Sequence, residues 1–184
     1  MRLSLRGCRG ELYRPACGHG DRQHRGVEVS GVGSYQEPVY GLPQAWAEFL
    51  DGFNPWSWYG HFTFRDYPHP EAACKAWDLF IHKLNRGIFG CRYYKRPSEG
   101  VTWARASEYQ KRGAIHFHGL LGRIPEGVRR LEYMDVWHEL GGISRIYPYQ
   151  ADRGAEYYMS KSTYAWKKGE IDLSSNLFQL LLTL

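Results

Sequence analysis

The sequence predicts an α+β fold built around an antiparallel sheet. Segments rich in aromatic and β-branched residues alternate with two longer stretches of helical periodicity. Two of the strand-like runs, 100–109 and 114–122, are separated only by a short basic turn, which is typical of an antiparallel hairpin. The length of 184 residues suits one domain of this kind.

The predicted elements follow one another with recognisable start and stop signals. From residue 58 they alternate as strand, helix, strand, strand, helix, strand and helix, over 58–64, 69–87, 100–109, 114–122, 128–142, 143–149 and 154–169. Pro70 opens the first helix, and we expect Gly87 to stop it. This order is that of a ferredoxin-like (RRM-like) sandwich, in which helices cover one face of the sheet and leave the other open. An additional helix then follows at the C-terminal end.

Residues 1–55 are expected to form an N-terminal extension of the domain over 56–184. They are rich in Gly, Pro and Arg and show little periodicity apart from a short helical patch over 43–53. Their arginines suit either an arm that grips DNA or a solvated tail. Four side chains of this extension could hold zinc, although not at a standard spacing: Cys8, Cys17, His19 and His24.

The composition favours a nucleic-acid partner over an acidic protein. The formal charge is +5, and the chain carries 7 Trp, 14 Tyr and 8 Phe, a mixture that suits phosphate backbones and stacked bases. The longest apolar run, 177–184, is too short to span a bilayer, which takes about 20 residues. The four cysteines are widely spaced and no signal peptide precedes them, so we expect reduced thiols in a cytoplasmic protein without a membrane partner.

The hairpin over 100–122 carries candidate metal ligands. Alternate residues of a strand share a face, so His116 and His118 point away from the face of Phe117. A three-residue turn over 111–113, with Gly113 in the left-handed conformation, would place Glu108 directly opposite His116. Two imidazoles and a carboxylate suit a divalent ion such as Mn²⁺, Mg²⁺, Co²⁺ or Zn²⁺ with open coordination positions.

The last predicted helix carries a candidate nucleophile. Tyr158 and Tyr157 precede Lys161 by three and four residues, so either phenol could lie beside the ammonium on one helical face. A nearby cation favours the phenolate and attracts phosphate. Adjacent residues lie about 100° apart around a helix, so only one of the two tyrosines can face the ion. The spacing favours Tyr158, and Tyr157 remains the alternative.

Together these motifs resemble the HUH endonucleases, in particular the nicking domain of rolling-circle replication initiators (Rep proteins). The pattern His-hydrophobic-His at 116–118 is similar to the family's central motif, and Glu108 lies eight residues before it. The run from Tyr158 to Lys161 is similar to the Tyr-x-x-Lys motif, and 61–64 resembles the less specific N-terminal motif. The resemblance spans about 58–168 in the family's order.

The resemblance implies a ferredoxin-like fold and a site for Mn²⁺ or Mg²⁺ held by Glu108, His116 and His118. Tyr158 would attack the scissile phosphate and retain the 5′ end as a phosphotyrosyl ester, with Lys161 positioning the phosphate. The expected substrate is single-stranded DNA at an origin or hairpin in a prokaryotic cell, on a plasmid or virus. Because no Walker A pattern occurs in the chain, a host or viral helicase and a polymerase would act in trans. Relaxases and transposases share this chemistry.

Three further residues are expected to contact the nucleic acid. Lys111 and Arg112 lie at the hairpin tip, where they could meet a phosphate backbone. His61 shares a strand face with Tyr59 and Thr63 and could line the site, or be a structural histidine. Two other classes remain open: a non-catalytic RNA-binding module, and an iron oxygenase with two histidines and one carboxylate. The first would leave the three candidate metal ligands without a role, and the second gives no role to Tyr158 and Lys161.

Overall fold

The computed structural model describes residues 42–53, 56–155, 159 and 171–177. The contacts within the chain divide it into two compact units, Met1–Ser34 and Tyr35–Leu184. All the described residues belong to the second unit, so they include part of the segment that we assigned to the N-terminal extension. The possible zinc ligands Cys8, Cys17, His19 and His24 lie outside the described residues.

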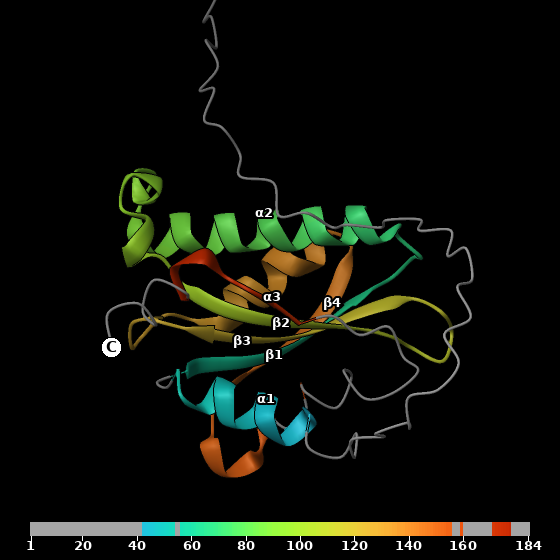
Figure 1. Ribbon diagram of the computed structural model, residues 1–184. Helices are drawn as coiled ribbons and strands as arrows, with labels where there is room; N and C mark the ends of the chain where they lie inside the picture. Colours follow the sequence, from blue (N-terminus) through green and yellow to red (C-terminus); the bar gives the residue numbers. More distant parts are fainter. Residues whose placement is uncertain (1–41, 54–55, 156–158, 160–170, 178–184) are drawn as a thin grey trace, which may run out of the picture. The chain divides into compact units, whose positions relative to one another are not determined.

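A five-stranded antiparallel sheet forms the centre of the described unit (Figure 1). Its strands are β1 (Trp56–Phe64), β2 (Thr102–Tyr109), β3 (Ile115–Gly122), β4 (Gly142–Pro148) and β5 (Ile171–Leu173), in the order β4-β1-β3-β2-β5. The predicted α+β class is confirmed, and the order of β1 to β4 is compatible with a ferredoxin-like sandwich. The short strand β5 was not predicted; it pairs with the outer edge of β2.

The helices α2 (Pro70–Phe89) and α3 (Arg130–Glu139) cover one face of the sheet (Figure 1). Phe62 of β1 lies at the centre of this layer. Its ring contacts Trp77 and Phe80 of α2 and Trp137 of α3, with ring centroids 5.0–5.1 Å apart and inclined edge to face. Large buried aromatic side chains therefore hold both helices on the face opposite the two histidines of β3.

The prediction that Gly87 stops α2 was wrong. The helix continues to Phe89 and is capped by Gly90, whose φ of 84° is left-handed. Gly87 instead lies where the Tyr133 side chain of α3 approaches the helix. A Cβ atom at position 87 would come within 2.4 Å of the Tyr133 hydroxyl oxygen, so the glycine permits close packing of the two helices.

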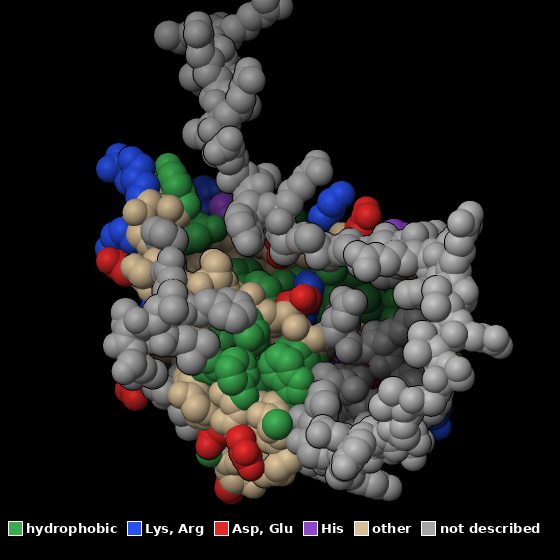
Figure 2. Space-filling view, viewed as in Figure 1, with side chains coloured by type: hydrophobic (Ala, Val, Ile, Leu, Met, Phe, Trp, Pro, Cys, Tyr) green, Lys and Arg blue, Asp and Glu red, His purple; other side chains and the backbone are tan. Residues whose placement is uncertain are grey.

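The second face of the sheet is partly covered, whereas an open face was predicted. Helix α1 (Leu42–Asp51), which overlaps the predicted helical patch 43–53, lies on this side (Figure 1). Hydrophobic side chains reach the surface between it and the sheet (Figure 2). A second buried cluster lies here and comprises Leu50, Trp56, Ala104, Ala106, Leu120, Ala155, Met159 and Leu177. The alanines of β2 and the leucine of β3 make this part of the sheet face apolar, and the other side chains of the cluster cover it.

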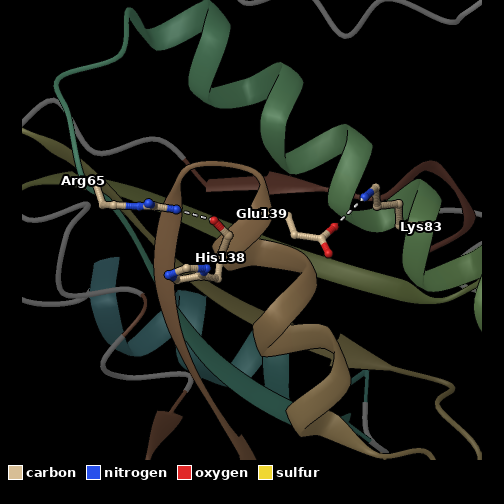
Figure 3. A network of polar contacts seen from close by, with 4 residues as sticks. All are labelled: Arg65, Lys83, His138 and Glu139. Carbon is tan, nitrogen blue, oxygen red and sulfur yellow. Dashed lines mark hydrogen bonds and ion pairs between the residues drawn. The ribbon is translucent and has the colours of Figure 1, made fainter.

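Polar contacts join the two covering helices to each other and to the sheet (Figure 3). Lys83 of α2 and Glu139 of α3 form an ion pair at 3.2 Å. Arg65, which follows β1, donates to the His138 carbonyl at the end of α3. Both partners of the ion pair are exposed, so we expect it to orient the helices more than to stabilise them.

Three short 3-10 helices complete the described elements: η2 (Tyr93–Lys95), η3 (Pro97–Glu99) and η4 (Ala151–Arg153). Of the two cysteines among the described residues, Cys74 is half-buried and Cys91 is exposed. Among the described helices, none has the length and apolar character needed to cross a bilayer.

Candidate metal centre

The β2–β3 hairpin forms with the turn that the sequence predicts. The Gln110 amide donates to the Ala114 carbonyl at 2.9 Å, and the Gly113 amide donates to the Gln110 carbonyl at 2.8 Å. Gly113 has a φ of 86°, in the left-handed region that a three-residue turn of this kind requires. The resulting register places Glu108 opposite His116, as predicted.

Strand β1 adds a third imidazole to the pair on β3. His61 lies directly opposite His118, and Thr63 lies opposite His116. The three histidines therefore share one sheet face, and one ring nitrogen of each lies within 4.8 Å of the other two. We expected His61 only to line the site, but its position makes it a potential ligand. This group of three could hold a metal ion.

The spacing of the ring nitrogens fits ligands of a common ion. The Nε2 atoms of His116 and His118 are 3.1 Å apart. Two nitrogens at this separation, each about 2.1 Å from one ion, subtend an angle of about 95° at it. That angle is close to the right angle between neighbouring ligands of an octahedral site, so the separation of the two nitrogens is compatible with their binding the same ion.

Burial keeps the histidines neutral and therefore able to bind a cation. Burial, assisted by repulsion from the neighbouring His61, lowers the pKa of His116 to about 4. Burial also lowers the pKa of His118 to about 3, with additional repulsion from His116 and His61. For His61 burial again lowers the pKa, assisted by Arg145. At neutral pH each ring is therefore uncharged and has one nitrogen with a lone pair, which is the form of histidine that binds a metal ion.

Tyr59 fixes the orientation of one of these rings. Its hydroxyl group lies 2.9 Å from Nδ1 of His118. When Nδ1 carries the ring proton and donates it to the Tyr59 oxygen, the Nε2 lone pair points into the site, which is the tautomer that a metal ligand needs. His116 has no equivalent support in the described part of the chain, where its buried Nδ1 has no hydrogen-bond partner.

Glu108 lies at the edge of the three histidines. Its Oε2 atom is 3.7 Å from Nε2 of His118, and its side chain is 36% exposed. The sequence predicted Glu108 as a ligand together with His116 and His118; it lies beside the histidine group but is not among the atoms that converge most closely. Its role as a ligand stays a prediction.

The two cations of the hairpin tip differ in their surroundings. Arg112 donates to the backbone carbonyls of Phe64 and Arg65 at the end of β1, and its Nε donates to Gln110 at 2.9 Å. Lys111 is exposed beside it. Arg112 thus ties the hairpin tip to β1, whereas Lys111 is available to a ligand. Contact of either residue with nucleic acid stays a prediction.

The histidine face continues onto the edge strand β4. Arg145 lies opposite His61, and Tyr147 lies opposite Tyr59. Both β4 side chains are exposed, and the Tyr147 ring stands edge to face with His61 at 6.2 Å between centroids. Arg145 forms no ion pair with any described residue. An exposed cation and an exposed aromatic ring therefore flank the candidate metal centre.

Tyr157, Tyr158 and Lys161 lie outside the described residues. Comparison of the chain with protein-family models, curated proteins and solved structures found no match.

Proposed function

We propose that this protein is a metal-dependent endonuclease and strand transferase that acts on single-stranded DNA and initiates rolling-circle replication. The observation that carries the proposal is the convergence of His61, His116 and His118 on one sheet face. His116 and His118 are buried and His61 is half-buried, and neutral imidazole nitrogens that converge in this way are typical ligands of a divalent ion. A non-catalytic nucleic-acid-binding sheet would give them no role.

The chemistry of the ligand set narrows the choice of ion. Imidazole nitrogens suit transition-metal ions better than Mg²⁺, which prefers oxygen ligands. Of the two ions that the resemblance implies, Mn²⁺ and Mg²⁺, we therefore favour Mn²⁺, with the Glu108 carboxylate contributing an oxygen ligand. When bound, such an ion polarises a phosphate oxygen and offsets the charge that develops on it.

The chain's own residues would supply the remaining steps. In the proposed reaction the Tyr158 oxygen forms a bond to phosphorus, the bond to the 3′ oxygen breaks, and the 5′ phosphate stays on the tyrosine. Lys161 would position the phosphate and favour the phenolate. The ester conserves the energy of the broken bond, so the same site could later rejoin a strand.

The surface beside the histidines suits a nucleic-acid strand. Arg145 can contact a phosphate, and the exposed Tyr147 ring can stack on a base. The hairpin-tip Lys111 offers another phosphate contact. A helicase and a polymerase acting in trans complete the proposed replication role.

The test is covalent trapping of DNA. The protein is incubated with Mn²⁺ and randomised single-stranded DNA, and an SDS-resistant protein–DNA adduct is sought by gel electrophoresis. The proposal expects the adduct in wild type and Tyr157→Phe but not in Tyr158→Phe or His118→Gln. His138→Gln serves as the control for histidine replacement, because that exposed ring lies at the end of α3, away from the histidine group.

A parallel measurement of Mn²⁺ binding shows whether a missing adduct reflects loss of the metal ion or loss of the cleavage reaction. An adduct that persists in Tyr158→Phe but disappears in Tyr157→Phe would move the nucleophile by one residue. Absence of the adduct in a protein that binds both Mn²⁺ and DNA would refute the endonuclease and favour a non-catalytic binding module.

A further inference from the structure

A basic and aromatic surface follows the C-terminal end of α2, on the opposite side of the sheet from the histidines. We define the η2 patch as Arg86, Arg92, Tyr94 and Lys95. Lys and Arg side chains gather over this loop, at the upper left of Figure 2. All four residues are exposed, and the Tyr94 side chain is 61% exposed.

The positive charge of the η2 patch is not balanced by acidic neighbours in the sequence. No Asp or Glu occurs between Asp78 and Glu99. The cations Lys83 and Arg96, which lie in the same interval, are engaged by Glu139 and Glu99. In contrast, Arg86, Arg92 and Lys95 form no ion pair with any described residue. These three charges therefore remain available to an anionic ligand.

The loop that carries the η2 patch is held by contacts with α2 and by hydrogen bonds within its own turn. The hydroxyl group of Tyr93 lies 2.7 Å from Nδ1 of His82 on α2. The turn also has backbone hydrogen bonds from Lys95 to Arg92 and from Arg96 to Tyr93. The Tyr93 ring stands edge to face with Tyr94, with centroids 6.3 Å apart. Tyr94 is therefore presented outward from a supported turn, at a reduced entropic cost of binding.

We propose that the η2 patch is a second contact site for single-stranded nucleic acid. Cations interleaved with an exposed aromatic ring suit a single strand, because the phosphates pair with the cations while a base stacks on the ring. A duplex would leave Tyr94 without a stacking partner. The inference that the bound strand is the flank of the cleaved DNA rests on the proposed function.

The position of the patch predicts how long a strand must be to use both sites. The loop leads into Thr102, four residues along β2 from Ala106, which lies opposite His118. Four residues of a strand span about 13 Å, and the patch lies beyond that end of β2 on the other side of the sheet. A strand bound at the histidines must therefore extend by several nucleotides to reach Tyr94.

The test compares DNA binding by a patch variant and a charge-matched control. Arg92→Ala/Lys95→Ala removes two charges from the patch. Lys75→Ala/Arg130→Ala removes two exposed charges elsewhere on α2 and α3. Fluorescence anisotropy is measured with single strands of about 8 and about 30 nucleotides, over a range of salt concentrations, and with a duplex of the longer length. Thermal unfolding confirms that each variant is folded.

We expect the patch variant to lose about tenfold in affinity for the long strand, with a salt dependence that is shallower by about 1 in the log–log slope. The short strand should bind as tightly as to wild type, and the control variant should show neither effect. Tyr94→Ala should also weaken only the long strand, whereas Tyr94→Trp should retain binding because it still stacks.

Three results would overturn the proposal: no loss in the patch variant, an equal loss for both strand lengths, or a loss confined to the duplex. Failure of the proposed function is recognised separately. If the patch variant shows the expected length dependence but wild type forms no covalent adduct, the nucleic-acid contact stands and the nuclease does not.

Discussion

His61 on β1 lies directly opposite His118 on β3, with ring centroids 4.7 Å apart and the rings inclined at 73°. This cross-strand pair turns the His-x-His pattern of β3 into a group of three nitrogens. The arrangement depends on the register between β1 and β3, because a shift of one residue would move His61 to the other face of the sheet.

Replacing His61 tests whether the third imidazole binds metal. We expect His61→Ala to weaken Mn²⁺ binding about as much as His118→Ala, because each removes one nitrogen from the group. Isothermal titration calorimetry measures the affinity. His138→Ala is the matched control, since the end of α3 lies on the opposite face. If His61→Ala binds Mn²⁺ with wild-type affinity, the site uses only the residues of the hairpin.

Replacing Tyr59 tests its support of the His118 ring. Tyr59→Phe keeps the ring but removes the hydroxyl group that lies 2.9 Å from Nδ1 of His118. Loss of such a supporting hydrogen bond lowers metal affinity by about tenfold or more. Calorimetric titration with Mn²⁺ measures this loss, and Tyr147→Phe, an exposed hydroxyl on the same face, should show none. Equal affinities for Tyr59→Phe and wild type would show that packing alone orients His118.

The hairpin could be predicted from the sequence because the residues that determine its turn and register are close together in the chain. The three-residue turn ending at Gly113 fixes the register, and the register brings Glu108 opposite His116. The place of His61 could not be predicted in the same way, because β1 and β3 are distant in the sequence. The motif at 61–64 indicated that His61 could line the site. Only the pairing of β1 with β3 places its ring beside His118.

The structure differs from the sequence predictions at two other places, the end of α2 and the second face of the sheet. Both differences arise from packing between residues that are distant in the sequence. A glycine that ends a helix and a glycine that admits a neighbouring side chain look alike in a sequence, and Gly87 is of the second kind because Tyr133 contacts it. Similarly, alternation in β2 and β3 identified the face of the histidines, but Leu120 and the alanines beside it extend a hydrophobic cluster over part of that face.

The metal-free protein should lose stability as the pH falls from about 7 to about 4. In the unfolded chain a histidine takes up a proton near pH 6.5, whereas His116 and His118 in the folded protein have pKa values of about 4 and about 3. The unfolded state then binds more protons, so the free energy of unfolding decreases with decreasing pH. For His116 the shift corresponds to about 3 kcal/mol.

Urea unfolding in the presence of a chelator, at pH values between about 7 and about 4, measures this dependence. His118→Gln removes one of the two buried titrating groups and should flatten the dependence of the free energy of unfolding on pH. A slope that is identical in His118→Gln and wild type would contradict the assignment of the pH dependence to these buried histidines.

The neighbouring cations Lys111 and Arg112 should behave differently when replaced. Arg112→Ala removes hydrogen bonds to the carbonyl groups of Phe64 and Arg65, so we expect it to lower the free energy of unfolding by about 1–3 kcal/mol. Lys111→Ala should leave stability unchanged within about 0.5 kcal/mol and weaken only the binding of single-stranded DNA. Urea unfolding and fluorescence anisotropy measure the two effects. Equal stability losses in both variants would contradict the structural role of Arg112.

The buried Arg105 of β2 gives a prediction about the short strand β5. Its guanidinium carbon lies 4.7 Å from the centroid of the Phe117 ring, and its NH2 group pairs with Asp172 of β5. Burial alone would lower the pKa of Arg105, but the interactions with Asp172, Cys74 and Asp78 outweigh it and raise the pKa. The pair therefore holds β5 on the sheet while it compensates a buried charge.

Asp172→Asn should destabilise the protein, because it leaves the Arg105 charge buried without its main carboxylate partner. The Asp172 side chain is 41% exposed, so water can replace part of the interaction, and we expect a loss of about 1–3 kcal/mol. Asp152→Asn, an exposed acid in η4, is the control. The double variant Arg105→Met/Asp172→Asn should recover much of the loss, because an apolar side chain then fills the site among Phe117 and Trp77. If Asp172→Asn unfolds at the same urea concentration as wild type, the ion pair does not hold β5, and the hydrogen bonds between β2 and β5 alone account for its position.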